Sequence, residues 1–221
     1  VVLIVGYVVS GGSVQLLVRG IGPTLAEYDV EGEIADPQLT LYNAGNQSLG
    51  TNDDWGLSPD ASAIATVSAQ IGAFTLPANS KDAVLLVTLE AGRYSAVMAG
   101  VNSATGIGLL ELYEVGGAQN PGRLINMSVR AQVGTDASVL IPGIVVGGSE
   151  ARTVLIRAIG PELDEFDVEG FLADPQLTLF NQQSVQLAMN DNWSTPNGTQ
   201  IASFGTQVGA FDLPNGSLDA A

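Results

Sequence analysis

The chain has 221 residues, which is enough for one or two domains with a buried core. It has no cysteine and no histidine, and its 23 acidic side chains against seven basic ones give a formal net charge of -16. The two missing residue types exclude Ser-His and Cys-His catalysis and zinc sites built on them, and the charge disfavours nucleic acid and anionic membranes as partners.

The first segments are predicted to be buried β-strands. Val1 to Val9 and Val14 to Arg19 are apolar runs separated by Ser10-Gly11-Gly12-Ser13, a composition typical of a hairpin. The opening run is too short to span a bilayer and has no basic segment ahead of it, so we interpret it as a strand and not as a signal peptide. We expect no membrane insertion.

The middle of the chain is predicted to contain strands and one short helix. Leu39 and Leu41 alternate with polar residues, which indicates a strand with one buried and one solvated face. Ser58 and Pro59, ahead of spaced apolar residues, indicate the start of a short helix that ends at Gly72. Three apolar segments that follow are expected to be strands, at residues 83–89, 93–101 and 108–115.

A glycine-rich segment, Gly116 to Gly122, is the one convincing linker in the sequence. It places one domain at residues 1–118 and a second at residues 119–221. Beyond the linker, Leu124 to Val133 and Ser138 to Val146 are expected to be strands.

An internal duplication supports two domains. ADPQLTLYN at residues 35–43 returns as ADPQLTLFN at residues 173–181, an offset of 138, and GAFTLP at residues 72–77 returns as GAFDLP at an offset of 137. A period of this length is a domain and not a solenoid repeat. The helix spacing also recurs, so we expect one short helix in each β-rich copy.

The two copies are cut at different phases. The second opens with Leu124 to Gly134, which has no counterpart in the first, whereas the first closes with strands between Ala83 and Val115 and the chain stops at Ala221, which aligns with Val84. We expect the first domain to lack its first strand and the second to lack its last strands, leaving apolar core and unpaired edges exposed.

Strands from a neighbouring molecule would cover such edges, and repeated head to tail they would build a helical homopolymer. The expected edges are Val1 to Val9 with Leu124 to Val133 on one side, and the chain after Phe211 on the other. The alternatives are a fragment of a longer tandem array and a lone two-domain protein.

The pattern DPQLTLY, NDDW, GAFTLP and AGRYSAVMAGV resembles the bacterial pre-peptidase C-terminal (PPC) domains and related repeats of large secreted proteins. The resemblance covers most of each copy, but the segments VRGIGP and VRAQVG lie outside it. It implies an all-β protein of two tandem jelly-roll-like β-sandwich domains, located outside the cell or at its surface. It also implies a binding, spacer or assembly role, and some relatives bind calcium or polymeric substrates.

Two clusters of oxygen-bearing side chains are candidate calcium sites. Calcium takes about six to eight oxygen ligands, but the EF-hand spacing is absent, and the alternative role of such residues is to cap turns. The clusters consist of Asp36, Asn52, Asp53 and Asp54 in the first copy and Asp174, Asn190, Asp191 and Asn192 in the second.

Each cluster is followed by a tryptophan, Trp55 or Trp193, that either stacks on a sugar or covers the end of a sandwich. Arg19 and Arg157 lie in apolar segments and share the offset of Asp36 and Asp174. A buried arginine needs a partner, so we predict structural arginine–carboxylate bridges.

Several N-x-S/T sequons make glycosylation a possibility if the protein is exported. The sequons begin at Asn46, Asn192, Asn197 and Asn215, and a fifth, at Asn126, falls in a predicted strand.

Carboxylate-pair catalysis needs neither histidine nor cysteine, but nothing in the sequence singles out such a pair, so we expect no enzyme. The expected function is that of a structural subunit of an extracellular bacterial fibre or surface array, which assembles head to tail by β-strand complementation. The alternative is a calcium- or polysaccharide-binding accessory module of a larger secreted enzyme or adhesin.

Overall fold

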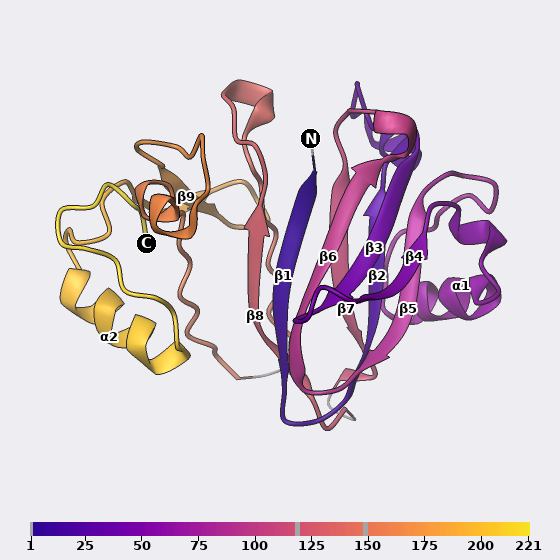
Figure 1. Ribbon diagram of the computed structural model, residues 1–221, viewed down its shortest axis with the longest axis horizontal. Coiled ribbons are helices and arrows are strands. Elements are labelled where there is room, and N and C mark those ends of the chain that lie inside the picture. The colour runs from indigo at the N-terminus through magenta and orange to yellow at the C-terminus, as the bar shows by residue number, and fades with distance from the viewer. Residues whose placement is uncertain (1, 118–119, 148–149) are drawn as a thin grey trace. The chain divides into compact units, whose positions relative to one another are not determined.

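The computed structural model describes residues 2–117, 120–147 and 150–221 (Figure 1). The chain divides into two compact units, Val1–Pro142 and Gly143–Ala221. Both contain antiparallel β-structure and one α-helix, so the predicted β-rich character and the short helix in each copy are confirmed. Within the described ranges, no helix combines the length and the apolar character needed to cross a bilayer.

The first unit is a β-sandwich. Its larger sheet has the strand order β4 (Ser48–Asn52), β3 (Pro37–Asn43), β6 (Gly92–Gly100), β1 (Leu3–Ser10) and β8 (Arg123–Arg130). Its smaller sheet has the order β5 (Ala83–Leu89), β2 (Val14–Ile21) and β7 (Leu109–Val115).

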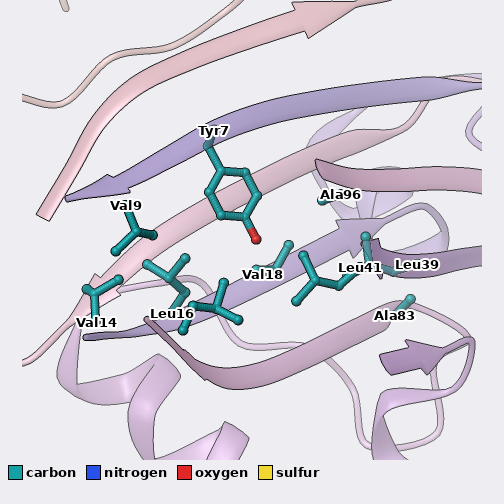
Figure 2. Close-up of a cluster of buried hydrophobic side chains, with 10 residues drawn as sticks. Tyr7, Val9, Val14, Leu16, Val18, Leu39, Leu41, Ala83 and Ala96 are labelled. Atoms are coloured by element: carbon teal, nitrogen blue, oxygen red, sulfur yellow. The ribbon is translucent and has the colours of Figure 1, made fainter. Parts of the chain in front are cut away.

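The core between the two sheets is built from alternate residues of their strands, because successive side chains of a strand point to opposite faces. Figure 2 shows Tyr7 and Val9 of β1 facing Leu16 and Val18 of β2. On the other face of β2, Leu17 packs in a second buried cluster with residues of α1 (Ala61–Gln70) and the loops around it. Because β2 is buried on both faces, its sequence is largely apolar instead of alternating, with Gln15 and Arg19 as its polar residues.

The predicted hairpin at Ser10 to Ser13 is wrong. β1 pairs with β6 and β8, whereas β2 pairs with β5 and β7, so the connection crosses from one sheet to the other. Gly11 and Gly12 have φ angles of 87° and 153°, which L side chains rarely adopt. This turn allows Val9 and Val14 to enter the same core from opposite sheets.

β8 belongs to the second repeat by sequence, but it completes the larger sheet of the first unit. It pairs antiparallel with β1, with Val5 opposite Val129 and Tyr7 opposite Met127, and Figure 1 shows β1 between β6 and β8. The first compact unit therefore ends at Pro142 and not at residue 118, and the second begins at Gly143 and not at residue 119. β1 is an interior strand, so the expectation that Val1 to Val9 offers a free edge is wrong.

The second unit has less paired structure than the first. It contains the 3-10 helix η6 (Pro161–Phe166), a hairpin of β9 (Leu177–Phe180) and β10 (Gln186–Asn190), α2 (Gly198–Val208), and a bridge between Ala158 and Ala220.

The strand predicted at Ser138 to Val146 does not form. Ser138 ends a 3-10 helix (Asp136–Ser138), residues 139–146 form neither helix nor strand, and Ile141 and Val145 are 81% and 97% exposed. Its counterpart in the first copy, β1, is held on both sides by β6 and β8. No such neighbours flank the segment in the described part of the chain, so its apolar sequence alone does not produce a strand.

Replacing Tyr7 with phenylalanine is expected to stabilise the first unit by about 1 kcal/mol, because the Tyr7 hydroxyl is buried and has no hydrogen-bond partner among the described residues. Burial, and then the nearby Tyr94, raise the pKa of Tyr7 well above its usual value. The folded state therefore favours the neutral Tyr7 hydroxyl. This contribution to the free energy of unfolding is fully present below about pH 10, the usual pKa of tyrosine, and is lost as the pH rises toward the higher pKa of the folded state.

Urea unfolding of wild-type and Tyr7→Phe protein at pH 7 and pH 11 measures both effects. The variant should lose less stability between the two pH values than the wild type does. A variant that is less stable at pH 7, or equally sensitive to alkali, would contradict the assignment.

Candidate functional site

In the first copy, two of the four predicted calcium ligands, Asp36 and Asn52, are engaged with other protein groups. Asp36 forms an ion pair with Lys81. The Asn52 side chain accepts a hydrogen bond from the backbone N–H of Val84 at 2.8 Å and donates one to the backbone oxygen of Asp54 at 3.3 Å. Asn52 therefore connects the end of β4 to the start of β5, which is the turn-capping role of asparagine.

Lys81 supplies the positive charge beside this cluster. The hydrogen bond and the charge of Asp36, followed by the charges of Asp54 and Asp53, raise the pKa of Lys81. Asp53 is exposed and, with Asp54, lines an open hollow of about 240 Å³. Nowhere in the described residues do three acidic side chains converge as metal ligands.

The second copy has the same arrangement without the lysine, because Leu218 stands where the first copy has Lys81. Asn190 accepts a hydrogen bond from the backbone N–H of Ala221 at 2.9 Å and donates one to the backbone oxygen of Asn192 at 3.2 Å. Asp174 and Asp191 are both exposed. The asparagines are structural in both copies, and calcium binding by the aspartates stays a prediction.

The two tryptophans cover the core instead of presenting a face to a ligand. Trp55 and Trp193 are 7% and 5% exposed, and their indole N–H groups donate to the backbone oxygens of Pro77 at 3.0 Å and Pro214 at 3.1 Å. A buried ring cannot stack on a sugar, so the geometry favours the covering role.

Each copy has a buried aspartate that sequence reasoning missed. Asp82 is fully buried and accepts hydrogen bonds from the backbone N–H of Gly22 at 2.7 Å, from the Ser80 hydroxyl at 2.6 Å and from the Thr24 hydroxyl. The Asp82 backbone oxygen accepts a further bond from the backbone N–H of Trp55 at 2.9 Å.

Asp219 repeats this network in the second copy. It accepts hydrogen bonds from the backbone N–H of Gly160 at 2.6 Å and from the Ser217 hydroxyl, and its backbone oxygen accepts one from the backbone N–H of Trp193 at 2.7 Å. The signal that would have found both aspartates is the shared Ser-x-Asp spacing, at residues 80–82 and 217–219.

The arginine bridges differ from the prediction. Arg19 is fully buried and its Nε lies 3.2 Å from Glu111 Oε2, not beside Asp36. The Arg19 guanidinium also stacks on Phe74, 4.3 Å from the ring centroid. Glu111 comes from β7, the strand that pairs with β2, and this pairing is not visible in the sequence offset that suggested Asp36.

Arg157 has the same aromatic contact but no such partner. Its guanidinium lies 4.2 Å from the Phe211 ring centroid, and its buried Nε and Nη2, like the three guanidinium nitrogens of Arg19, have no hydrogen-bond acceptor among the described residues. Burial lowers the pKa of Arg157, and the charges of Asp219, Asp212 and Glu162 only partly oppose this effect. None of these carboxylates lies within ion-pair distance of Arg157 in the described part of the chain.

The predicted glycosylation sites differ in accessibility. Asn46, Asn197 and Asn215 are exposed in turns or loops between elements, and Asn126 is exposed on β8. Asn192 is half-buried next to Trp193. The exposed positions permit attachment of a sugar, and modification itself stays a prediction.

No protein-family model, curated protein or solved structure matched this chain. The function of the chain is therefore inferred from the geometry of each unit and from the internal duplication.

Proposed function

We propose that the chain is a structural subunit of an extracellular bacterial fibre or surface array, in which copies join head to tail by β-strand complementation between tandem jelly-roll-like sandwiches. The observation that carries the proposal is the position of β8 in the sheet of the first unit. By sequence it opens the second repeat, yet it serves as the outer strand of the first unit's sheet. Repeats of this kind therefore already share strands within one chain.

The outer edge of β8 is suited to receive a further strand. In the described residues β8 pairs only with β1, so its other edge is open. Ile125 and Met127 on β8 are 64% and 47% exposed. An edge strand with exposed apolar side chains favours pairing with another chain, since the ladder hydrogen bonds need no particular sequence.

The second unit offers apolar surface that its counterpart in the first unit buries. Val154 and Leu179 are 48% and 38% exposed, whereas the aligned Leu16 and Leu41 are 0% exposed. Burying such surface against added strands stabilises an assembly by about 25 cal/mol for each Å² of apolar area removed from water.

The net charge sets the conditions for assembly. At a formal charge of -16, copies repel one another at low ionic strength, and salt screens this repulsion. We therefore expect fibres to form more readily at 0.5 M salt, a concentration chosen to shorten the screening length to about 4 Å, than in dilute buffer.

Electron microscopy and size-exclusion chromatography with light scattering across a salt series test the proposal. The wild-type chain should form fibres, and Ile125→Lys should prevent them by placing a charge on the β8 edge. Leu57→Lys is the matched control, because Leu57 is 84% exposed and lies in a 3-10 helix instead of on the β8 edge. A monodisperse monomer at every salt concentration would refute the proposal.

A further inference from the structure

The strands of the larger sheet carry no acidic residue. The chain has 23 aspartates and glutamates, but none of them lies in β1, β3, β4, β6 or β8. One face of this sheet covers the core, and in a chain of formal charge -16 the strands supply no carboxylate to the other, outer face either. A negatively charged group that approaches the outer face is therefore not repelled by these strands.

Two arginines are exposed on the outer face. The buried residues of β1 alternate with Ile4 and Val8, which therefore point outward. Arg93 of β6 lies opposite Val8, and Arg130 of β8 lies opposite Ile4. Both arginines are exposed, and neither forms an ion pair within the described residues. They stand four residues apart along β1, about 13 Å at the usual rise of a strand.

Gly6 lies midway between the two arginines on the central strand of the three, which Figure 1 shows between β6 and β8. Its neighbours across the sheet are Ser95 and Ser128, so this point of the face carries only small side chains. Glycine inside a strand weakens the strand and often marks a place where another group approaches closely. The second copy has Gly143 at the aligned position, an offset of 137.

Each unit also presents an exposed aromatic ring between two carboxylates, at the end of the 3-10 helices η1 (Pro23–Tyr28) and η6. We call this feature the Glu-aromatic-Asp turn, and it consists of Glu27, Tyr28 and Asp29 in the first copy and Glu165, Phe166 and Asp167 in the second. Tyr28 and Phe166 are each 53% exposed, and all four carboxylates are exposed. Each ring packs on a second aromatic side chain, at 5.0 Å between ring centroids, which holds it in place.

We propose that the outer face of the larger sheet binds the Glu-aromatic-Asp turn of a second copy of this chain. The aromatic ring covers Gly6, and the flanking carboxylates pair with Arg93 and Arg130. The turn matches the face in both respects, since aromatic side chains are enriched at interfaces and opposite charges select the partner. The inference goes beyond strand complementation, because this contact uses a sheet face and no strand edge. Turn and face are different surfaces, so the contact can repeat from copy to copy.

Sedimentation equilibrium of the whole chain tests the contact. Every protein carries Ile125→Lys, which removes the proposed fibres, and the buffer contains about 0.15 M salt, where the screening length is about 8 Å. The face variant is Arg93→Glu with Arg130→Glu, and the turn variant is Glu27→Arg with Glu165→Arg. Each should associate at least about tenfold more weakly than the parent protein. An equimolar mixture should recover association, because the turn of one variant and the face of the other are intact.

The matched control is Glu31→Arg with Glu169→Arg, which makes the same change in charge at exposed residues outside the turn and should not weaken association. A parent protein that stays monomeric at about 1 mM would overturn the proposal. So would a mixture that does not recover, or a control that weakens association as much as the turn variant does. The glutamine pair Arg93→Gln with Arg130→Gln replaces the face variant if circular dichroism shows that charge reversal disturbs the fold.

The two contacts between copies are separable. Association of the Ile125→Lys parent without fibres of the wild type would support the sheet-face contact and remove strand complementation. Fibres of the wild type with a monomeric Ile125→Lys parent would support strand complementation and remove the sheet-face contact.

Discussion

Replacing Asp82 with alanine is expected to lower the free energy of unfolding of the first unit by about 3 to 5 kcal/mol. Asp82 is fully buried, and its carboxylate accepts hydrogen bonds from the Gly22 N–H, the Ser80 hydroxyl and the Thr24 hydroxyl. Alanine leaves these donors without an acceptor in a site that excludes water. The loss is large because a buried donor that loses its partner bears its full desolvation cost.

Urea unfolding followed by tryptophan fluorescence measures this loss. Asp82→Asn should cost less than Asp82→Ala, because the amide oxygen still accepts the 2.7 Å bond from Gly22. Asp53→Ala is the control on an exposed carboxylate, and it should change stability by less than about 0.5 kcal/mol. A loss below about 1 kcal/mol for Asp82→Ala would show that the network does not hold the unit together.

The aspartate network also explains why the two repeats keep the same local structure although their sheets differ. Trp193, Asp219 and Asn190 repeat the hydrogen bonds of Trp55, Asp82 and Asn52, except those that Thr24 donates to Asp82, since Glu162 stands at the aligned position. The network thus forms in the second unit without the five-stranded sheet that lies beyond it in the first. The network is therefore a local feature of each repeat, and it does not depend on the sheets that surround it.

Local patterns in the sequence predicted local structure well. The helix follows from the apolar spacing that begins at Ile64, although its N-cap is Asp60 and not Ser58. The strand at Leu39 and Leu41 follows from alternation, with both side chains fully buried. These features depend on residues near one another in the chain, which is the range that periodicity reports.

Strand pairing was beyond the reach of the sequence. The turn at Ser10 to Ser13 has hairpin composition, but it crosses between sheets because Val9 and Val14 enter one core from opposite sides. β8 follows a linker and begins a repeat, so the duplication assigned it to the second domain, whereas its ladder with β1 assigns it to the first. Pairing of this kind is decided by contacts between distant residues, which neither turn composition nor a repeat offset encodes.

In the candidate site, too, local features were predictable from the sequence and contacts between distant residues were not. Asparagines beside aspartates indicated turn chemistry as well as calcium, and the hydrogen bonds of Asn52 and Asn190 agree with the turn role. The burial of Arg19 was expected from its apolar strand, but its partner was not, since Glu111 comes from a strand more than ninety residues away in the chain. Only the register of β2 with β7 brings the two together.

Replacing Glu111 with leucine is expected to destabilise the first unit by about 3 to 5 kcal/mol, because it leaves the fully buried Arg19 without a counter-charge. The double variant Arg19→Met with Glu111→Leu should lie within about 1 kcal/mol of the wild type, since an apolar pair of similar volume needs no counter-charge. The double-mutant cycle therefore gives a large coupling energy. Losses that simply add would show that the pair is not coupled.

The same variant has a spectroscopic consequence. Burial, followed by the hydrogen bond that the Tyr113 hydroxyl donates to Glu111 at 2.8 Å, raises the pKa of Tyr113 to about 12. Glu111→Leu should lower this pKa only part of the way toward 10, because burial is the larger cause and remains. Ultraviolet titration of phenolate absorbance measures the change.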